Sequence, residues 1–175
     1  LFLIFSYHLI MNEIDKLGHP SLKSKSTLVR DFDKGLHKLI DQMYEIMYNA
    51  NGVGLAAPQI SKNIQLFVYD SGSGPKHCIN PRLITKKDTS VFYEGCLSLP
   101  GYYFDIRRAD YVKVESFNIF NKKEIHEGDE LTARVLQHEI DHLKGKVLLS
   151  RLKRKERREA ITRIALEGFP GKHEH

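Results

Sequence analysis

The stretch that most constrains this chain is Gln137-His138-Glu139-Ile140-Asp141-His142, where a glutamate follows the first of two histidines four residues apart. Residues i and i+4 lie on one face of an α-helix, one turn apart. Both imidazoles can therefore reach one metal ion, and Glu139 lies beside whatever that ion activates. Taken alone, the motif is also compatible with two core histidines that make ordinary hydrogen bonds.

The surrounding residues predict that this motif lies on a buried helix. Leu131 and Val135 share one helical stripe with both histidines. Asp129 favours a helix start and Gly145 a stop. Further apolar side chains lie off the stripe: Leu136, Ile140 and Leu143. A helix that is apolar on several sides is typically buried. Its polar groups then need compensation, which a metal ion would provide.

Composition narrows the class of protein. The chain has 175 residues, 41% hydrophobic and 28% charged, which is typical of one soluble globular domain with its own core. The formal net charge of +5 brings nucleic acid into consideration as a partner. Two cysteines make no disulfide framework and fit a reducing compartment, so a cysteine is free to act as a ligand or nucleophile. No apolar run is long enough to span a bilayer.

Two other stretches carry candidate chemistry. Residues 52–59 (GVGLAAPQ) combine small residues, which allow close approach of a ligand or another backbone, with the amide of Gln59. An ordinary glycine turn is the alternative interpretation. Residues 94–101 (EGCLSLPG) contain Cys96, the plausible soft third metal ligand. Cys78 lies in apolar surroundings and is interpreted as a buried structural cysteine.

Periodicity and turn signals predict the remaining elements. Residues 31–50 form a core-packing helix, and residues 102–106 and 111–117 form strands. Residues 64–69 form another strand, and residues 78–84 an edge or interrupted strand because they contain Pro81. We expect a hairpin or loop over residues 121–129 and a basic surface helix after residue 150.

The order and content of three blocks, residues 52–59, 94–98 and 137–142, resemble peptide deformylase. This family consists of metallohydrolases that remove the formyl group from the N-terminal methionine of nascent bacterial and organellar proteins. The similarity runs roughly from Leu17 to Leu152, although Lys23 stands where the family has an arginine. The resemblance implies an α+β fold, with antiparallel β-sheets packed around a central metal-binding helix, an N-terminal helix and a basic C-terminal helix.

The resemblance also implies a domain organisation. Most family members begin near the position of Met11, so we expect residues 1–10 (LFLIFSYHLI) to be an extra apolar segment. Residues 11–168 are expected to form a single catalytic domain and residues 169–175 a flexible tail.

The resemblance implies that Cys96, His138 and His142 bind one divalent metal ion. Three protein ligands leave a fourth position open, as in catalytic sites. The metal implied is Fe(II), with Zn, Ni or Co as alternatives, because this ligand set does not choose between them. Glu139 is implied as the general base that deprotonates metal-bound water for attack on the formyl carbonyl, and then as the acid. Gln59 and the backbone N–H of Leu97 are implied to stabilise the oxyanion.

Other residues are assigned by the same resemblance. Those implied to bind substrate are Val53, Gly54, Gly95, Leu131 and Val135. Those implied to brace or orient the metal ligands are Glu94, Arg108, Gln137 and Asp141.

The expected partners are N-formylmethionyl peptides, and the ribosome through the basic segment from Arg151 to Arg163. A solvated helix face is the alternative for that segment. We expect a monomer in the bacterial cytoplasm and no membrane association. An organelle is the alternative, although the N-terminus lacks the pattern of a transit peptide.

Two other functions fit part of the pattern. A zinc endopeptidase of the HExxHxxGxxH type would need a histidine where Leu148 stands, and a glutamate-ligated type would need a ligand from the basic tail segment. Neither explains Cys96 or Gln59. A non-catalytic metal- or ribosome-binding relative is the other alternative, but such relatives usually lose the base or a ligand, and here all are present.

Overall fold

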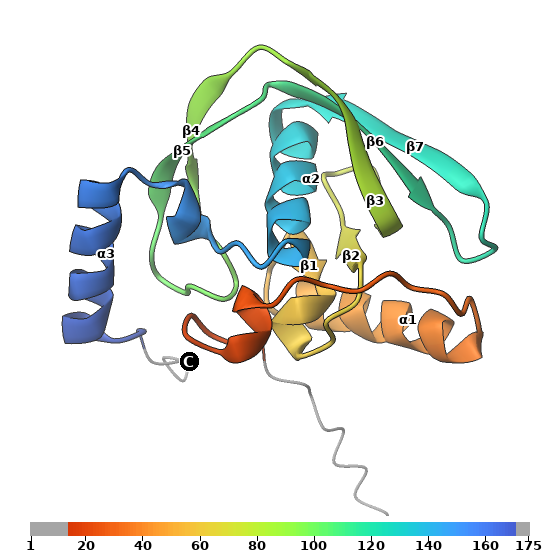
Figure 1. Ribbon diagram of the computed structural model, residues 1–175, viewed down its shortest axis with the longest axis horizontal. Helices are drawn as coiled ribbons and strands as arrows, with labels where there is room; N and C mark the ends of the chain where they lie inside the picture. Colours follow the sequence, from red (N-terminus) through yellow and green to blue (C-terminus); the bar gives the residue numbers. More distant parts are fainter. Residues whose placement is uncertain (1–13, 171–175) are drawn as a thin grey trace, which may run out of the picture.

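The computed structural model describes residues 14–170, which combine three α-helices with two antiparallel sheets (Figure 1). The extra segment expected at residues 1–10 and the end of the expected tail, residues 171–175, lie outside the described residues. Phe169, from the start of that tail, packs edge-on against Tyr102 with ring centroids 6.3 Å apart. The expected mixture of helices and antiparallel sheets is confirmed.

The larger sheet has five strands in the order β1-β2-β3-β6-β7. These are β1 (Gly54–Ala56), β2 (Leu66–Tyr69), β3 (Lys76–Lys87), β6 (Tyr111–Phe117) and β7 (Lys123–Asp129). The smaller sheet pairs β4 (Ser90–Glu94) with β5 (Phe104–Arg108). Three short 3₁₀ helices connect these elements: η1 (Pro20–Lys23), η2 (Ala57–Ile60) and η3 (Leu148–Arg151).

Helix α1 (Lys34–Asn49) confirms the helix expected over residues 31–50 and packs on β1 and β2. The Asp33 carboxylate caps its first turn by accepting a hydrogen bond from the Leu36 N–H at 2.9 Å. The helix ends before Asn51, whose φ of 53° is in the left-handed region that asparagine tolerates.

Helix α2 (Glu130–Leu143) carries the two histidines and lies between the two sheets (Figure 1). It packs against β1, β2, β6 and β7, with Ala133 and Leu136 fully buried in the core of the larger sheet. Gly145 follows the helix at φ 68°, where a Cβ atom would lie 2.5 Å from the Lys23 carbonyl oxygen. The helix therefore ends where predicted, and only glycine fits at this position because a side chain would clash with the Lys23 carbonyl group.

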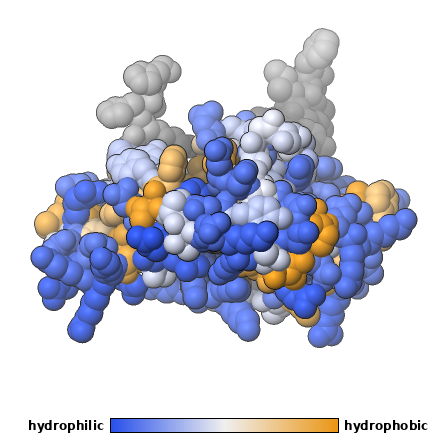
Figure 2. All heavy atoms as spheres, turned by 90° about the horizontal axis from the view of Figure 1, so that it is seen from above, coloured by the Kyte–Doolittle hydropathy of each residue, from blue (hydrophilic) through white to orange (hydrophobic). Residues whose placement is uncertain are grey.

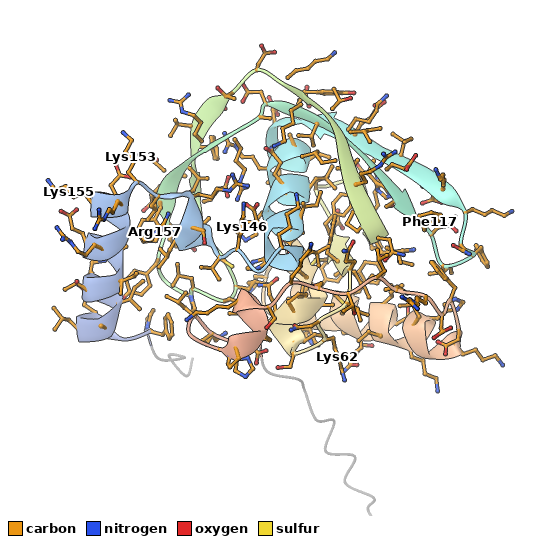
Figure 3. The ribbon with its side chains drawn as sticks, viewed as in Figure 1. Lys62, Phe117, Lys146, Lys153, Lys155 and Arg157 are labelled. Carbon is orange, nitrogen blue, oxygen red and sulfur yellow. The ribbon has the colours of Figure 1, made fainter. Side chains whose placement is uncertain are left out.

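Helix α3 (Arg154–Glu167) follows η3 and confirms the basic helix. Ala160 and Ile164 pack with Leu148 of η3 and Ile106 of β5, so η3 and α3 cover the smaller sheet. Exposed cations such as Lys153 and Lys155 project outward near the start of α3 (Figure 3).

Strand β3 departs from one of the two expectations for residues 78–84. It is an interrupted strand, as one alternative stated, but it is not an edge strand, because it pairs with both β2 and β6. Pro81 lies where the register shifts between Ile79 and Arg82, beside Asn80 at φ 51°. A proline without an N–H is tolerated at such a bulge even inside a sheet.

Most of the surface seen in Figure 2 is hydrophilic, and its hydrophobic residues form separate small patches. Among the described residues, no helix is both long and apolar enough to cross a membrane.

Two histidines on strands of the larger sheet, the half-buried His77 of β3 and the buried His126 of β7, make stability depend on pH. The Tyr44 hydroxyl lies 3.1 Å from Nδ1 of His77, and the Tyr69 hydroxyl lies 2.9 Å from Nδ1 of His126. Burial lowers the pKa of both rings, although the Glu124 carboxylate acts in the opposite direction. The folded state therefore binds fewer protons than the unfolded state near pH 6.5, so stability falls as the pH falls below that value.

We expect the Tm at equal metal content to decrease from pH 7.5 to pH 5.5, by about 2–4 °C for each kcal/mol of stability lost. In a His126→Asn variant, the side-chain amide oxygen can still pair with Tyr69 but does not titrate, so the decrease should be smaller. Parallel curves for the parent and this variant would contradict the assignment to His126.

Candidate metal centre and active site

Cys96, His138 and His142 bring three ligand atoms within 4.8 Å of one another, and they are the one group of this kind among residues 14–170. Cys96 follows the end of β4, and the histidines lie one turn apart on α2. The Cys96 Sγ atom is 3.3 Å from Nε2 of His142. Residues that are distant in the sequence therefore converge where α2 faces the loop after β4.

The chemistry of these three residues fits a divalent transition metal. Burial alone would raise the pKa of Cys96, but the neighbouring His142 and His138 rings outweigh it and hold that pKa well below its usual range. The thiolate, the form that binds metals, is thus favoured. One thiolate and two imidazoles suit such an ion better than Mg²⁺ or Ca²⁺. Nδ1 of the buried His142 ring has no partner in the described part of the chain.

Glu94 orients one of the histidines. Its Oε2 atom lies 3.4 Å from Nδ1 of His138, which leaves the other ring nitrogen for an ion. Burial raises the pKa of Glu94, but hydrogen bonds from His138 and Arg108 outweigh it and lower that pKa to about 2. The carboxylate is therefore ionised when it meets the ring.

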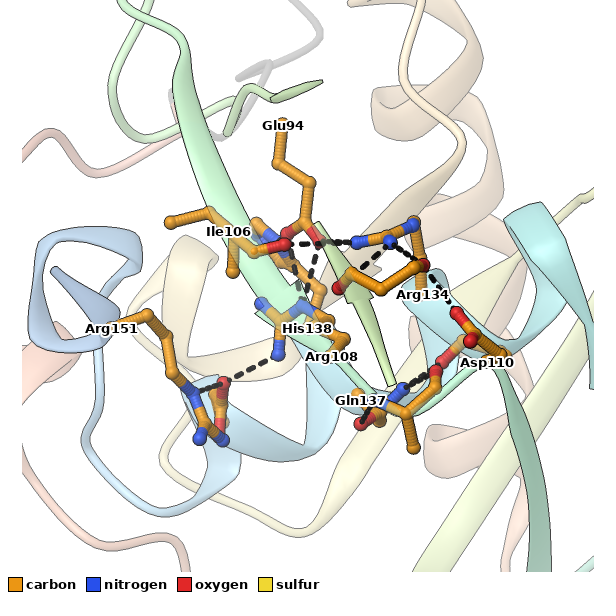
Figure 4. Close-up of polar contacts among 12 residues, drawn as sticks. Glu94, Ile106, Arg108, Asp110, Arg134, Gln137, His138 and Arg151 are labelled. Atoms are coloured by element: carbon orange, nitrogen blue, oxygen red, sulfur yellow. Dashed lines mark hydrogen bonds and ion pairs between the residues drawn. The ribbon is translucent and has the colours of Figure 1, made fainter. Parts of the chain in front are cut away.

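Buried charges extend from Glu94 along α2 (Figure 4). Arg108 donates from Nε to both Glu94 oxygens, at 2.8 and 3.0 Å, and from Nη1 to Asp141 at 2.9 Å. Arg151 also binds Asp141, from Nε at 2.7 Å. Glu94 and Asp141 thus each have a cationic partner, and removing one member would leave an uncompensated charge.

Gln137 plays a different part from the one expected. It was predicted to orient a metal ligand, but its Nε2 donates to the carbonyls of Ala109 and Ala133, both at 2.9 Å. Its Oε1 accepts from the Ala109 N–H at 3.1 Å. No hydrogen bond in the described residues joins Gln137 to a ligand. It fastens α2 to the connection between β5 and β6.

Gln59, which lies on η2, has an amide held at both ends. Its Oε1 accepts from the Ala56 N–H at 2.8 Å, and its Nε2 donates to Ser98 Oγ at 3.1 Å. The same nitrogen lies 3.8 Å from Cys96 Sγ. The backbone N–H of Leu97 donates no hydrogen bond to any described residue. Two donors therefore flank Cys96.

A cleft of about 1140 Å³ opens beside these groups. Its lining includes all the residues predicted to bind substrate: Val53, Gly54, Gly95, Leu131 and Val135. Glu139 also lines the cleft, although it is 4% exposed, and its Oε2 has no partner among the described residues. Burial raises the pKa of Glu139, and the charges of His138 and His142 act against this.

Gly54 allows the carboxylate of Glu139 to approach the strand. A Cβ atom at Gly54 would lie 2.3 Å from Oε1 of Glu139. A Cβ atom at Gly95 would lie 2.6 Å from the Tyr103 ring. Both glycines line the cleft, so a ligand can approach the backbone of β1 and of the loop after β4 closely.

The sequence interpretation missed three polar residues that support the site: Ser98, Arg134 and Arg151. Arg134 had a detectable signal, because it stands four residues before His138 and eight before His142. Ser98 had none, since its partner Gln59 is 39 residues away in the chain. Arg151 was assigned to the basic surface segment, although its partner Asp141 is only ten residues earlier.

An α+β fold with a thiolate, two imidazoles and a buried glutamate beside an open cleft defines a hydrolytic metalloenzyme. The family model described as polypeptide deformylase matches residues 11–158. The chain belongs to this family of enzymes, which remove the N-formyl group from nascent peptides.

Individual relatives agree with this assignment. A peptide deformylase from Desulfitobacterium hafniense is 41% identical over 146 residues, covering 83% of this chain and 97% of the relative. Peptide deformylase 1 from Bacillus anthracis is 43% identical, covering 82% and 95%. The crystal structure of the Thermotoga maritima peptide deformylase matches with a TM-score of 0.80 at 40% identity, covering 82% and 98%. The Synechococcus elongatus peptide deformylase, in complex with actinonin, matches with a TM-score of 0.82 at 36% identity, covering 90% and 88%.

Proposed function

We propose that the protein is a metal-dependent hydrolase that removes the formyl group from N-terminal formylmethionine of nascent polypeptides and releases formate. The observation that carries this proposal is the convergence of Cys96, His138 and His142 beside the buried carboxylate of Glu139 in an open cleft. We further propose that residues 11–168 form one catalytic domain, which the extent of the family match supports.

Cys96, His138 and His142 would hold one divalent ion. We propose Fe(II), with Zn, Ni or Co as alternatives, because the donor set accepts all four. When bound, the ion supplies a Lewis acid that polarises a carbonyl oxygen and makes a water molecule more acidic. Glu94 keeps the His138 ring in the orientation that binding requires.

Glu139 is proposed as the general base and then the general acid. Its unpartnered Oε2 takes a proton from water while the water oxygen bonds to the formyl carbon. The same carboxyl group then gives that proton to the amide nitrogen as the carbon–nitrogen bond breaks. The products are formate and the free N-terminal amine of methionine.

Gln59 and Leu97 are proposed to stabilise the oxyanion that develops on the formyl oxygen. The Ala56 N–H fixes the oxygen end of the Gln59 amide, so that Nε2 points toward Cys96. The Leu97 N–H makes no hydrogen bond within the described chain and is free to donate. Donors held in place before the reaction cost no reorganisation during it.

The cleft would bind the rest of the substrate. Val53, Leu131 and Val135 form an apolar wall suited to a methionine side chain. Gly54 and Gly95 would pair with the peptide backbone as with an added strand. Asp141 and Arg108 act at a distance, by holding Glu94 and α2 in place.

Replacing Gly54 with alanine should lower kcat for formate release by about 10- to 100-fold, since a displacement of about 1 Å at a reacting group has effects of this size. The new methyl group would occupy the space of the Glu139 carboxylate and move it. Metal content should be unchanged, because neither residue is a proposed ligand.

Gly35→Ala is the matched control, because a Cβ atom there would also lie near a carboxylate, at 3.1 Å from Oδ1 of Asp33, but on α1. This variant should keep the parent kcat. A Gly54→Ala enzyme with the parent kcat would show that Glu139 does not need its observed position.

We propose contact with the ribosome through exposed cations at the start of α3, with Lys153 and Lys155 as test positions (Figure 3). Arg157 is not offered for this role, because it donates to the carbonyls of Leu149, Ser150 and Leu152. Co-sedimentation with ribosomes should weaken in a Lys153→Glu/Lys155→Glu double variant, and unchanged co-sedimentation would contradict this contact. We also propose that the protein is a monomer, which sedimentation would test. We propose the bacterial cytoplasm as its location, which its similarity to bacterial relatives supports.

The function is tested by measuring formate release from a formyl-Met-Ala peptide by protein loaded anaerobically with Fe(II) or Ni(II). The parent should release formate, and Cys96→Ser should lose both bound metal and turnover. The matched control is Cys78→Ala, which removes the other, fully buried thiol and should keep both. No formate from folded, metal-loaded parent protein would refute the proposed function. Metal retained by Cys96→Ser would refute the ligand assignment.

A further inference from the structure

Arg134 is a buried cation on α2, 8% exposed, that none of the proposed steps uses. It lies one turn before His138 on the same face of the helix and contributes to the lining of the cleft. A cation in this position must be compensated by well-placed acceptors, and their positions indicate what the residue does.

The guanidinium group joins α2 to both strands of the smaller sheet. Nη1 donates to Oε1 of Glu94 at 3.0 Å and to the Ile106 carbonyl at 3.2 Å. Nη2 donates to Oγ of Ser90 at 2.8 Å and to the Ser90 carbonyl at 3.4 Å. Its carbon lies 4.9 Å from the centroid of the Phe92 ring. One side chain thus fixes the beginning, middle and end of β4 and the centre of β5.

The contacts of Arg134 affect the proposed metal centre in two ways. Ser90 Oγ also donates to Asp110, so the guanidinium group lies between Glu94 and a second carboxylate (Figure 4). Glu94 in turn contacts His138, so the ion pair with Arg134 helps to hold in place the carboxylate that orients a proposed metal ligand. The strand that leads to Gly95 and Cys96 is held at its position beside the cleft by the same group.

We propose that Arg134 is a positioning residue with two separable effects. Its charge on Glu94 supports metal retention through His138. The two terminal nitrogens of its guanidinium group, which bind Glu94 and Ser90, set the position of β4 and hence the binding of the peptide substrate. The second effect rests on the deformylase function proposed above, whereas the first requires only a metal site.

Two variants separate these effects. Arg134→Met removes the charge and all donors at similar length, so it should lose Ni(II) to a chelating dye about tenfold faster and raise KM about tenfold. Arg134→Lys keeps a charge within reach of Glu94, but one ammonium group cannot also reach Ser90. The lysine variant should therefore retain Ni(II) like the parent and still show the raised KM. In both variants kcat should stay within about threefold of the parent, because a raised KM with unchanged kcat marks lost binding only.

Arg82→Met is the matched control, because Arg82 forms an exposed ion pair with Glu115 away from the cleft. It should match the parent in both measurements. A parent-like KM in Arg134→Lys would overturn the role in positioning β4, and this holds even if the methionine variant fails to fold. Equal Ni(II) loss from the lysine and methionine variants would overturn the role of the charge. If the parent itself releases no formate, the deformylase function fails, while Ni(II) retention still tests the link from Arg134 to His138.

Discussion

Replacing Glu139 with glutamine should lower kcat for formate release by about 10²- to 10⁴-fold and leave the metal content unchanged. Glutamine has the same shape but cannot take a proton from water at neutral pH. Glu139 is buried, and its Oε2 has no hydrogen-bond partner among the described residues, so the carboxylate is available for proton transfer. It is not one of the three residues whose ligand atoms converge.

Steady-state kinetics and metal analysis of the same preparation would check this expectation. Glu45→Gln is a suitable control, because Glu45 is exposed on α1 and lies outside the cleft. Its kcat should equal that of the parent. Turnover within tenfold of the parent in Glu139→Gln would remove Glu139 from the mechanism, and loss of metal would indicate that it is a ligand.

Replacing Gln59 with leucine should lower kcat by about 10²- to 10³-fold, the usual effect of losing one oxyanion donor. Metal content should be retained, because the Gln59 amide lies beside Cys96 without being one of the three converging donors. The leucine variant also leaves the Ala56 N–H without its acceptor, so its Tm should fall.

A second variant separates catalysis from folding. Gln59→Glu keeps an oxygen for the Ala56 N–H but removes the amide donor, so it should lose a similar factor in kcat. Gln65→Leu removes an amide that binds the Ser26 carbonyl elsewhere and should leave kcat unchanged. A glutamate variant with the parent kcat would exclude Gln59 as an oxyanion donor.

The helices were predictable from the sequence because helical spacing of apolar residues and residues typical of helix ends are local features. Asp33 caps α1, and Gly145 stops α2 at a positive φ. Strand β1 was not predicted, since its three residues are too few to show alternation and all three are buried. Strand β4 was not predicted, because its central residues are exposed and its stability comes from pairing with β5.

The site was predictable to the extent that its chemistry is local. The spacing of His138 and His142 is a property of one helix turn, whereas Cys96 was only a candidate soft ligand until the resemblance to a family implied that it binds the same ion. The hydrogen bonds of Gln137 could not be foreseen, because its partner Ala109 lies on another element. The position where a zinc endopeptidase of the HExxHxxGxxH type would have its third histidine holds Leu148, which is buried in the hydrophobic cluster around η3.

The order of the site residues along the chain has a consequence for its assembly during synthesis. Gln59 leaves the ribosome first, then Cys96, then the two histidines, and Arg151, which holds Asp141 from η3, follows last. The proposed metal ligands come from the loop after β4 and from α2, so the set is complete only when His142 has been synthesised. An ion that needs all three ligands therefore has no site while the first strands are being made. Because such an ion binds only the arrangement in which the ligands converge, metal supply would affect both the stability of that arrangement and the fraction of protein that is active.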